Sequence, residues 1–180
     1  MCWQVELEHT LNHLRNANKL PRIAIVGVGH EFCGDDAAGI LLIRELKRYK
    51  VNEPGLLVIE ADQSPENFCG VLRAFLPDLV IIVDAAWMGR DPGTVRWLSW
   101  QEADGSGILT HGLPIKEFSN YIATELNCDI GLLGIQPACT HFFAPLSAEM
   151  KSAIQTTTIE LMDVLEGWIQ PTLRLECKIN

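Results

Sequence analysis

The stretch "RIAIVGVGHEFCGDDAAGILLIRELKRY", residues 22–49, decides the fold because three segments of different character follow one another in it. Residues 23–28 are apolar and predict a buried strand. Residues 37–49 predict a helix with Ile40, Ile43 and Leu46 on one face. The glycine-rich loop 27–39 joins the two. A strand, a tight loop and a helix in this order indicate an α/β protein.

The loop 27–39 does not fit a phosphate site, although its glycines suggest one. The dinucleotide pattern GxGxxG fails at its third glycine. Gly29 and Gly34 have P-loop spacing, but Asp35 and Asp36 occupy the Lys and Ser/Thr positions. Because two carboxylates repel a phosphate, the loop suits a cation or a proton-transfer role. A helix cap explains one aspartate, and we assign it to Asp35.

The rest of the chain repeats the alternation of strand and helix. Strands are predicted at 55–61, 78–87, 93–100 (an antiparallel edge strand) and 129–135, and helices at 65–76, at 114–125 and after an N-cap at Ser147. The predicted fold class is α/β: a single-domain three-layer sandwich, with a twisted, mostly parallel sheet and helices on both faces.

Three segments are expected along the chain. Residues 1–20 form an accessory amphipathic helix whose apolar contacts are Val5, Leu7, Leu11 and Leu14. Residues 21–170 form the main domain, and residues 171–180 are a tail without a strong pattern.

Composition excludes several classes of protein. The chain has 180 residues and a formal net charge of -9, which argues against nucleic-acid binding. No apolar run is long enough for a membrane span, and the N-terminus has no secretory pattern, so we expect a cytoplasmic protein without a membrane partner. Six scattered cysteines without a CxxC pair predict free thiols, mostly buried.

Candidate functional residues follow the predicted strands, where ligands bind in open α/β sheets. Asp84 ends an apolar strand, a costly place for an unpaired carboxylate. Together with Asp36 and His111 it would supply two oxygens and one imidazole, a set that leaves a metal open to a substrate. Gln136 follows another strand and is expected to line the same crevice. His141, Phe142 and Phe143 would form a wall near it, although packing in the core is the simpler interpretation of the aromatic residues.

The chain resembles the [NiFe]-hydrogenase maturation endopeptidases, most closely the type that processes the large subunit of formate-hydrogenlyase hydrogenase. The resemblance covers roughly residues 22–168 and is carried by "GVGHEFCGDDAAG", "SPENF", "LVIIVDAAWMGRDPGTVR", "THGLPI" and "LGIQP". It implies a cytoplasmic enzyme that removes a C-terminal extension from the large-subunit precursor after nickel insertion.

The resemblance also implies roles for single residues. The family's metal-binding and catalytic residues fall on Asp36, Asp84 and His111. The nickel is expected to come with the precursor, so no tightly bound cofactor of the protease's own is expected. The family's glycine-containing turn is replaced by Glu60, Ala61 and Asp62. We expect Glu60, Asp62 and Gln136 to contact the substrate.

Three other functions stay open from the sequence. With its altered turn, the chain would bind a metal or the precursor without cleaving it, as a maturation chaperone does. A metal-dependent hydrolase of small substrates on a flavodoxin-like scaffold would turn over without any hydrogenase subunit. A nucleotide-binding module is the weakest alternative, because of the aspartates in the loop.

Overall fold

The computed structural model describes residues 2–15, 20–49, 53–99, 109–110 and 114–169. Its α-helices are α1 (Trp3–Leu14), α2 (Ala38–Arg48), α3 (Cys69–Phe75), α4 (Pro114–Leu126) and α5 (Ala148–Ile169). Short 3₁₀ helices, η1 (Gly34–Ala37) and η2 (Pro65–Phe68), precede α2 and α3. The strands are β1 (Ile23–Val28), β2 (Leu56–Asp62), β3 (Leu79–Trp87), β4 (Val95–Ser99), β5 (Leu109–Thr110) and β6 (Asp129–Ile135).

The strands of the described residues form one mostly parallel sheet in the order β2-β1-β3-β6-β4. β1 pairs in parallel with β2 and β3, and β3 pairs in parallel with β6. β4 is antiparallel to β6 at the edge, as its sequence predicts, and the short β5 pairs with β3. Every residue of β1 is buried, which is typical of a central parallel strand.

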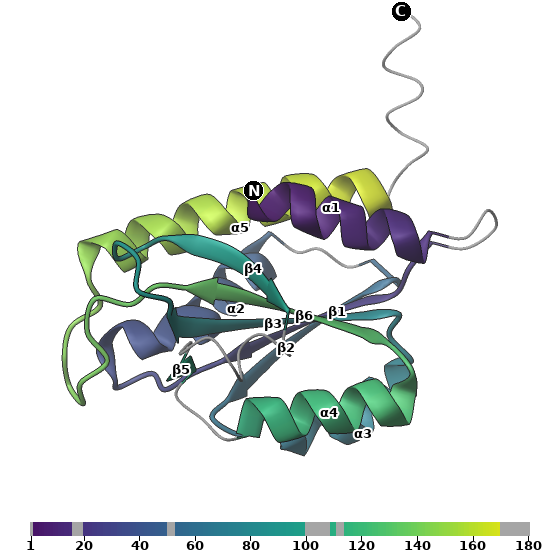
Figure 1. The fold of residues 1–180 in the computed structure, drawn as a ribbon, viewed down its shortest axis with the longest axis horizontal. Helices are drawn as coiled ribbons and strands as arrows, with labels where there is room; N and C mark the ends of the chain where they lie inside the picture. The colour runs from purple at the N-terminus through teal and green to yellow at the C-terminus, as the bar shows by residue number, and fades with distance from the viewer. Residues whose placement is uncertain (1, 16–19, 50–52, 100–108, 111–113, 170–180) are drawn as a thin grey trace, which may run out of the picture.

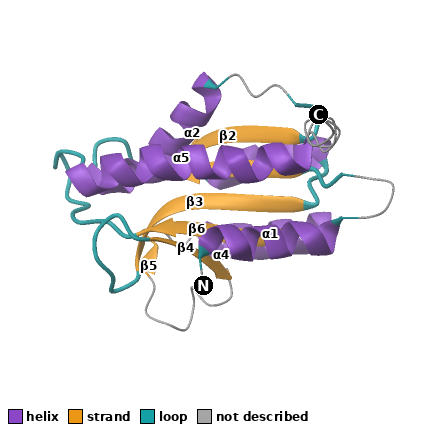
Figure 2. Ribbon diagram, turned by 90° about the horizontal axis from the view of Figure 1, so that it is seen from above, coloured by secondary structure: helices purple, strands orange, loops and turns teal. Residues whose placement is uncertain are grey.

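Helices cover both faces of this sheet, so the predicted α/β sandwich is confirmed. On one face, side chains such as Ile25 and Ile81 pack with α1, α2 and α5. On the other face, Val26 and Ile82 pack with α3 and α4. Figure 1 shows α1 and α5 on one side of the sheet and α4 with α3 on the other. Seen from above, α5 lies between α2 and α1 (Figure 2).

Helix α1 is packed into the main core. Leu7 and Leu11 are fully buried and Trp3 nearly so, while Leu14 packs against the same core. The prediction for Val5 was wrong, since its side chain is 51% exposed. Successive residues of a helix are about 100° apart, so Val5 points away from the stripe that holds Leu7 and Leu11.

Strand β3 runs to Trp87, which confirms the strand predicted at 78–87, but Asp84 lies inside it and not at its end. The pairing with β1 stops at Val83, and the pairing with β6 continues to Ala85. Over the last two residues of β3, β5 pairs with it. Asp84 therefore lies inside the strand, just past the point where its pairing with β1 ends.

The cysteines of the described residues are free, and most of them are not buried. The five cysteines in the described residues are free thiols, but only Cys128 among them is buried, so the prediction of mostly buried cysteines was wrong. The sixth, Cys177, lies outside the described residues. Among the helices that the structure describes, none has the length and apolar character needed to cross a membrane.

Candidate active site

The loop after β1 brings Asp36 back to the end of the sheet. Gly29 has a φ of 140°, and a Cβ placed there would lie 1.9 Å from the backbone oxygen of Asp36. The next residue, His30, donates its backbone N–H to that same oxygen at 3.3 Å. Glycine is therefore required at position 29, because any side chain would push the Asp36 segment away.

Asp36 and Asp84 form the centre of the candidate site. They are 6% and 2% exposed, and Asp84 Oδ1 accepts a hydrogen bond of 2.8 Å from the Ala85 backbone N–H. Burial raises the pKa of Asp84 well above its usual value, and the nearby negative charge of Asp36 raises it further. Two buried carboxylates in mutual repulsion are an environment that a cation would stabilise.

His111, the third predicted ligand, lies outside the described residues. Within the described part of the chain, no group of three His, Cys, Asp or Glu side chains is arranged to hold a metal ion. The two aspartates are therefore the two described members of a set of three predicted ligands, and the imidazole stays a prediction.

Asp35 does not cap its own helix, so that prediction was wrong. Its carboxylate is fully buried and accepts hydrogen bonds from the backbone N–H of Ala138 at 2.7 Å and of Ser147 at 2.8 Å. The Ser147 hydroxyl donates a third bond at 2.8 Å. Ser147 Oγ also accepts from the Met150 N–H at 3.1 Å, which confirms Ser147 as the N-cap of α5.

Gln136 is buried at the end of β6, and its side chain holds a neighbouring loop. Its Oε1 accepts hydrogen bonds from the backbone N–H groups of Met88 at 2.7 Å and Arg90 at 3.2 Å. Its Nε2 donates to the Pro137 carbonyl at 3.1 Å. These contacts hold the loop after β3 in place. Gln136 would therefore affect a substrate indirectly, by positioning that loop.

Glu60 lies on the opposite face of the sheet from Asp84. Glu60 pairs with Gly27, which pairs with Val83, so by strand alternation Glu60 and Asp84 point to different sides. The Glu60 carboxylate forms a 2.9 Å hydrogen bond with Nε of Arg44 in α2. The structure therefore separates Glu60 from Asp84.

Asp62 lies at the end of β2 with an exposed side chain and a φ of 49°. Its carbonyl accepts the Gly29 N–H at 3.0 Å, so its backbone supports the loop that leads to Asp36. Arg44 links the same region, because it contacts Glu31 of that loop at 2.7 Å and Glu60 of β2 at 2.8 Å. No pattern in the sequence predicts this role of Arg44, because the role depends on β2 lying beside β1.

Phe142 and Phe143 are 59% and 77% exposed, so the prediction of core packing was wrong for both. They lie in the loop between β6 and α5, which contacts the loop after β1. The Asp35 N–H donates to the Cys139 carbonyl at 2.9 Å, and the Phe143 N–H donates to the Phe32 carbonyl at 2.7 Å. Two adjacent phenylalanines in a connection where polar turn residues are usual were the available signal.

Cys33 lies in the same loop as the aspartates and is a potential nucleophile. Burial raises the pKa of its thiol, and the negative charge of Asp36 adds to this effect. The reactive thiolate form is therefore disfavoured at neutral pH.

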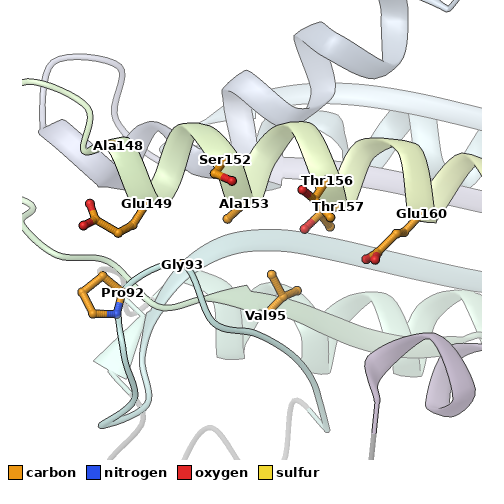
Figure 3. A pocket seen from close by; sticks show the side chains of 10 residues that line it. All are labelled: Pro92, Gly93, Val95, Ala148, Glu149, Ser152, Ala153, Thr156, Thr157 and Glu160. Carbon is orange, nitrogen blue, oxygen red and sulfur yellow. The ribbon is translucent and has the colours of Figure 1, made fainter.

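A pocket of about 550 Å³ lies between α5 and the start of β4, and it is distinct from the aspartate pair. Figure 3 shows the side chains of α5 that line the pocket, among them Glu149 and Glu160, above Pro92, Gly93 and Val95. Val95 packs in the core on the α1, α2 and α5 side of the sheet. By strand alternation Asp84 points to the other side, together with Val80 and Ile82.

The fold and the site together define an α/β protein with paired acidic residues at the carboxyl ends of its central strands. The chain belongs to the hydrogenase maturation protease family, whose HycI model matches residues 40–164. It is therefore a member of a peptidase family, as the resemblance of its motifs implies.

Individual relatives agree with this assignment. A protein of Methanocaldococcus jannaschii, provisionally named a hydrogenase maturation protease, is 33% identical over 88% of this chain and 95% of its own length. The hydrogenase 3 maturation protease of Escherichia coli K12 is 34% identical over 78% of this chain and 86% of its own. The crystal structure of the [NiFe] hydrogenase maturation protease HycI from Thermococcus kodakarensis matches with a TM-score of 0.78 and 32% identity, over 89% of this chain and 99% of that one.

Proposed function

We propose that this chain is an endopeptidase that removes a C-terminal extension from the large-subunit precursor of a [NiFe]-hydrogenase. Its family supports peptidase activity in hydrogenase maturation. The relative from Thermococcus kodakarensis is named a [NiFe] hydrogenase maturation protease, which supports this class of hydrogenase. The observation that carries the proposal is the buried pair of Asp36 and Asp84 at the carboxyl ends of the central strands.

We infer that nickel takes part as a component of the precursor. Asp36, Asp84 and His111 would contact it, since carboxylate oxygens and an imidazole nitrogen are suitable ligands. The raised pKa of Asp84 supports this inference, because a divalent cation would offset the repulsion between the two carboxylates. If cleavage depends on this contact, the precursor is cleaved only after nickel has been inserted.

The chemistry that fits this site is attack by water on a peptide bond. The water oxygen bonds to the carbonyl carbon, the C–N bond breaks, and the leaving nitrogen gains a proton. Water is preferred to Cys33 as the nucleophile because the raised pKa of that thiol disfavours the thiolate. The precursor's nickel would supply positive charge near the reacting bond. In this proposal Asp36 and Asp84 orient the precursor, and a carboxylate accepts the proton of the attacking water.

The proposed partner is the precursor protein. A cytoplasmic location and the absence of a nucleic-acid partner stay predictions. The runner-up is a non-cleaving chaperone, and the feature that favours it is the replaced turn, where Glu60 forms ion pairs with Arg44 and Lys47.

The test is the intact mass of the precursor after incubation with the wild-type protein, with the precursor prepared nickel-loaded and nickel-free. We expect loss of one C-terminal peptide from the nickel-loaded form alone. Equal cleavage of both forms would contradict the role of nickel and leave the peptidase. Stable binding of the cognate nickel-loaded precursor without any cleavage would favour the chaperone.

A further inference from the structure

Three phenylalanine side chains are exposed on the two loops beside Asp36. Phe32 is 55% exposed, Phe142 is 59% exposed and Phe143 is 77% exposed. Single exposed apolar residues are common on protein surfaces, but a contiguous group of large ones is typical of an interaction site. We call His30, Phe32, Phe142 and Phe143 the aromatic surface.

The members of the aromatic surface hold one another in place. The ring centroids of Phe142 and Phe143 are 4.2 Å apart, and those of His30 and Phe142 are 5.6 Å apart in an edge-to-face arrangement. His30 also lies 6.0 Å from Phe32. The backbone bond from Phe143 N–H to the Phe32 carbonyl joins the two loops directly. The surface is thus ordered before any partner binds, which lowers the entropic cost of binding.

Phe143 has an unfavourable backbone conformation that its packing does not explain. Its φ is 61°, in the left-handed region that bulky residues rarely adopt. A ring that is 77% exposed returns little burial energy for this strain. Strained residues of this kind concentrate at functional sites, because the surrounding structure holds them there for a purpose other than stability.

The aromatic surface is continuous with the candidate site. The His30 backbone N–H donates to the carbonyl of Asp36, one of the two central aspartates. The other loop is fixed to the same segment, because Ala138 and Ser147 both donate to the carboxylate of Asp35. The aromatic surface is therefore carried by the same two loops that hold the segment of Asp35 and Asp36 in place.

We propose that the aromatic surface binds an apolar segment of the large-subunit precursor next to the bond that is cleaved. This inference rests on the proposed function and adds to it the residues that select the protein substrate. An apolar polypeptide is the occupant that fits, because the three phenylalanines offer ring faces and no charge. The aromatic surface would place the precursor, while Asp36 and Asp84 act on it.

The test compares Phe143→Asn with a matched control, Tyr49→Asn. Tyr49 is an aromatic residue of similar exposure, 53%, at the far end of α2 from the site. We expect Phe143→Asn to raise KM for the nickel-loaded precursor about tenfold, as expected for loss of a contact at the centre of an interface, with kcat nearly unchanged. Asn tolerates a left-handed φ, so the Tm of this variant should equal or exceed that of the wild type. The control should match the wild type in KM.

Other results would overturn the inference. An unchanged KM for Phe143→Asn, when the wild type cleaves, would remove the aromatic surface from substrate binding while leaving the proposed function intact. If the wild type does not cleave, the proposed function fails, and the inference is then tested by the Kd of each protein for the same precursor. Equal Kd values for wild type and variant, or no binding by either, would overturn the inference. A wild-type dimer that Phe143→Asn converts to a monomer, in sedimentation at matched concentration, would assign the surface to a second copy of this chain instead.

Discussion

At the scale of single residues, Asp84 carries its carboxyl into the protein interior beside a second carboxylate. Its pKa is raised in the folded protein, so the folded state binds the proton more tightly than the unfolded state does. The loss of stability is absent at low pH, where Asp84 is protonated in the folded and in the unfolded protein. It grows as the pH rises through the pKa that Asp84 has in the folded protein. This arrangement costs stability at neutral pH, as functional sites often do.

We predict that Asp84→Asn raises the Tm at pH 7.5 and lowers the rate of precursor cleavage about 100-fold or more. The amide keeps an acceptor for the Ala85 N–H and removes the buried charge. The gain in Tm should shrink as the pH falls toward about 3.9, the usual value for an unfolded aspartate. Thermal unfolding at several pH values measures this, with the exposed Asp129→Asn as control. A lower Tm for Asp84→Asn at pH 7.5 would refute the account of Asp84.

The meeting of Asp36 and Asp84 could be predicted because Asp36 lies in the loop after β1 and Asp84 near the carboxyl end of β3, and parallel strands end at the same edge of a sheet. The partners of Asp35 could not be predicted. They lie more than 100 residues away, in a loop whose path depends on tertiary packing. A local helix cap was the simplest interpretation of an aspartate at this position, and long-range hydrogen bonds replaced it.

At the scale of elements, Asp35 joins the loop after β1 to the first turn of α5. Its buried carboxylate accepts three hydrogen bonds from Ala138 and Ser147. Because the two loops of the site meet through this carboxylate, its loss should loosen both loops and the start of the helix.

We predict that Asp35→Ala lowers the free energy of unfolding by about 3 kcal/mol or more, since it leaves two backbone N–H groups without this acceptor. Ser147→Ala removes one hydroxyl and should cost about 1 kcal/mol, as expected for an N-cap. Urea unfolding of both variants gives the comparison. Equal losses for the two would show that the carboxylate does not hold the loops together.

The elements themselves were largely predictable, because buried strands and amphipathic helices differ in their apolar periodicity. The helix α5 is an example: Ile154, Leu161 and Trp168 recur at helical spacing and pack on the core. The short strand β5, which pairs with Ala86 and Trp87, could not be predicted. A strand of two residues leaves no periodic signal.

At the scale of the whole molecule, the alternation of strands and helices predicts the sandwich, while the way α1 packs depends on tertiary contacts. α1 covers β4 and α5, and its buried side chains belong to the core that includes β1 and β3. Its place in the core was not evident from a sequence that suggests an accessory helix.

We predict that Leu7→Ala lowers the free energy of unfolding by about 2–5 kcal/mol, the usual cost of emptying a fully buried leucine site. Val5→Ala, on the exposed side of the same helix, should change it by less than about 0.5 kcal/mol. Denaturant unfolding of both variants measures this. Similar small effects would mean that α1 is dispensable for the fold.

The measurement that tests the central claim most directly is the intact mass of a nickel-loaded large-subunit precursor after incubation with wild type and with Asp36→Asn. The account predicts loss of one C-terminal peptide with the wild-type protein and an unchanged mass with Asp36→Asn. Cleavage by both proteins at the same rate would contradict the role of Asp36. An unchanged precursor after incubation with the wild-type protein would contradict the assignment as an endopeptidase.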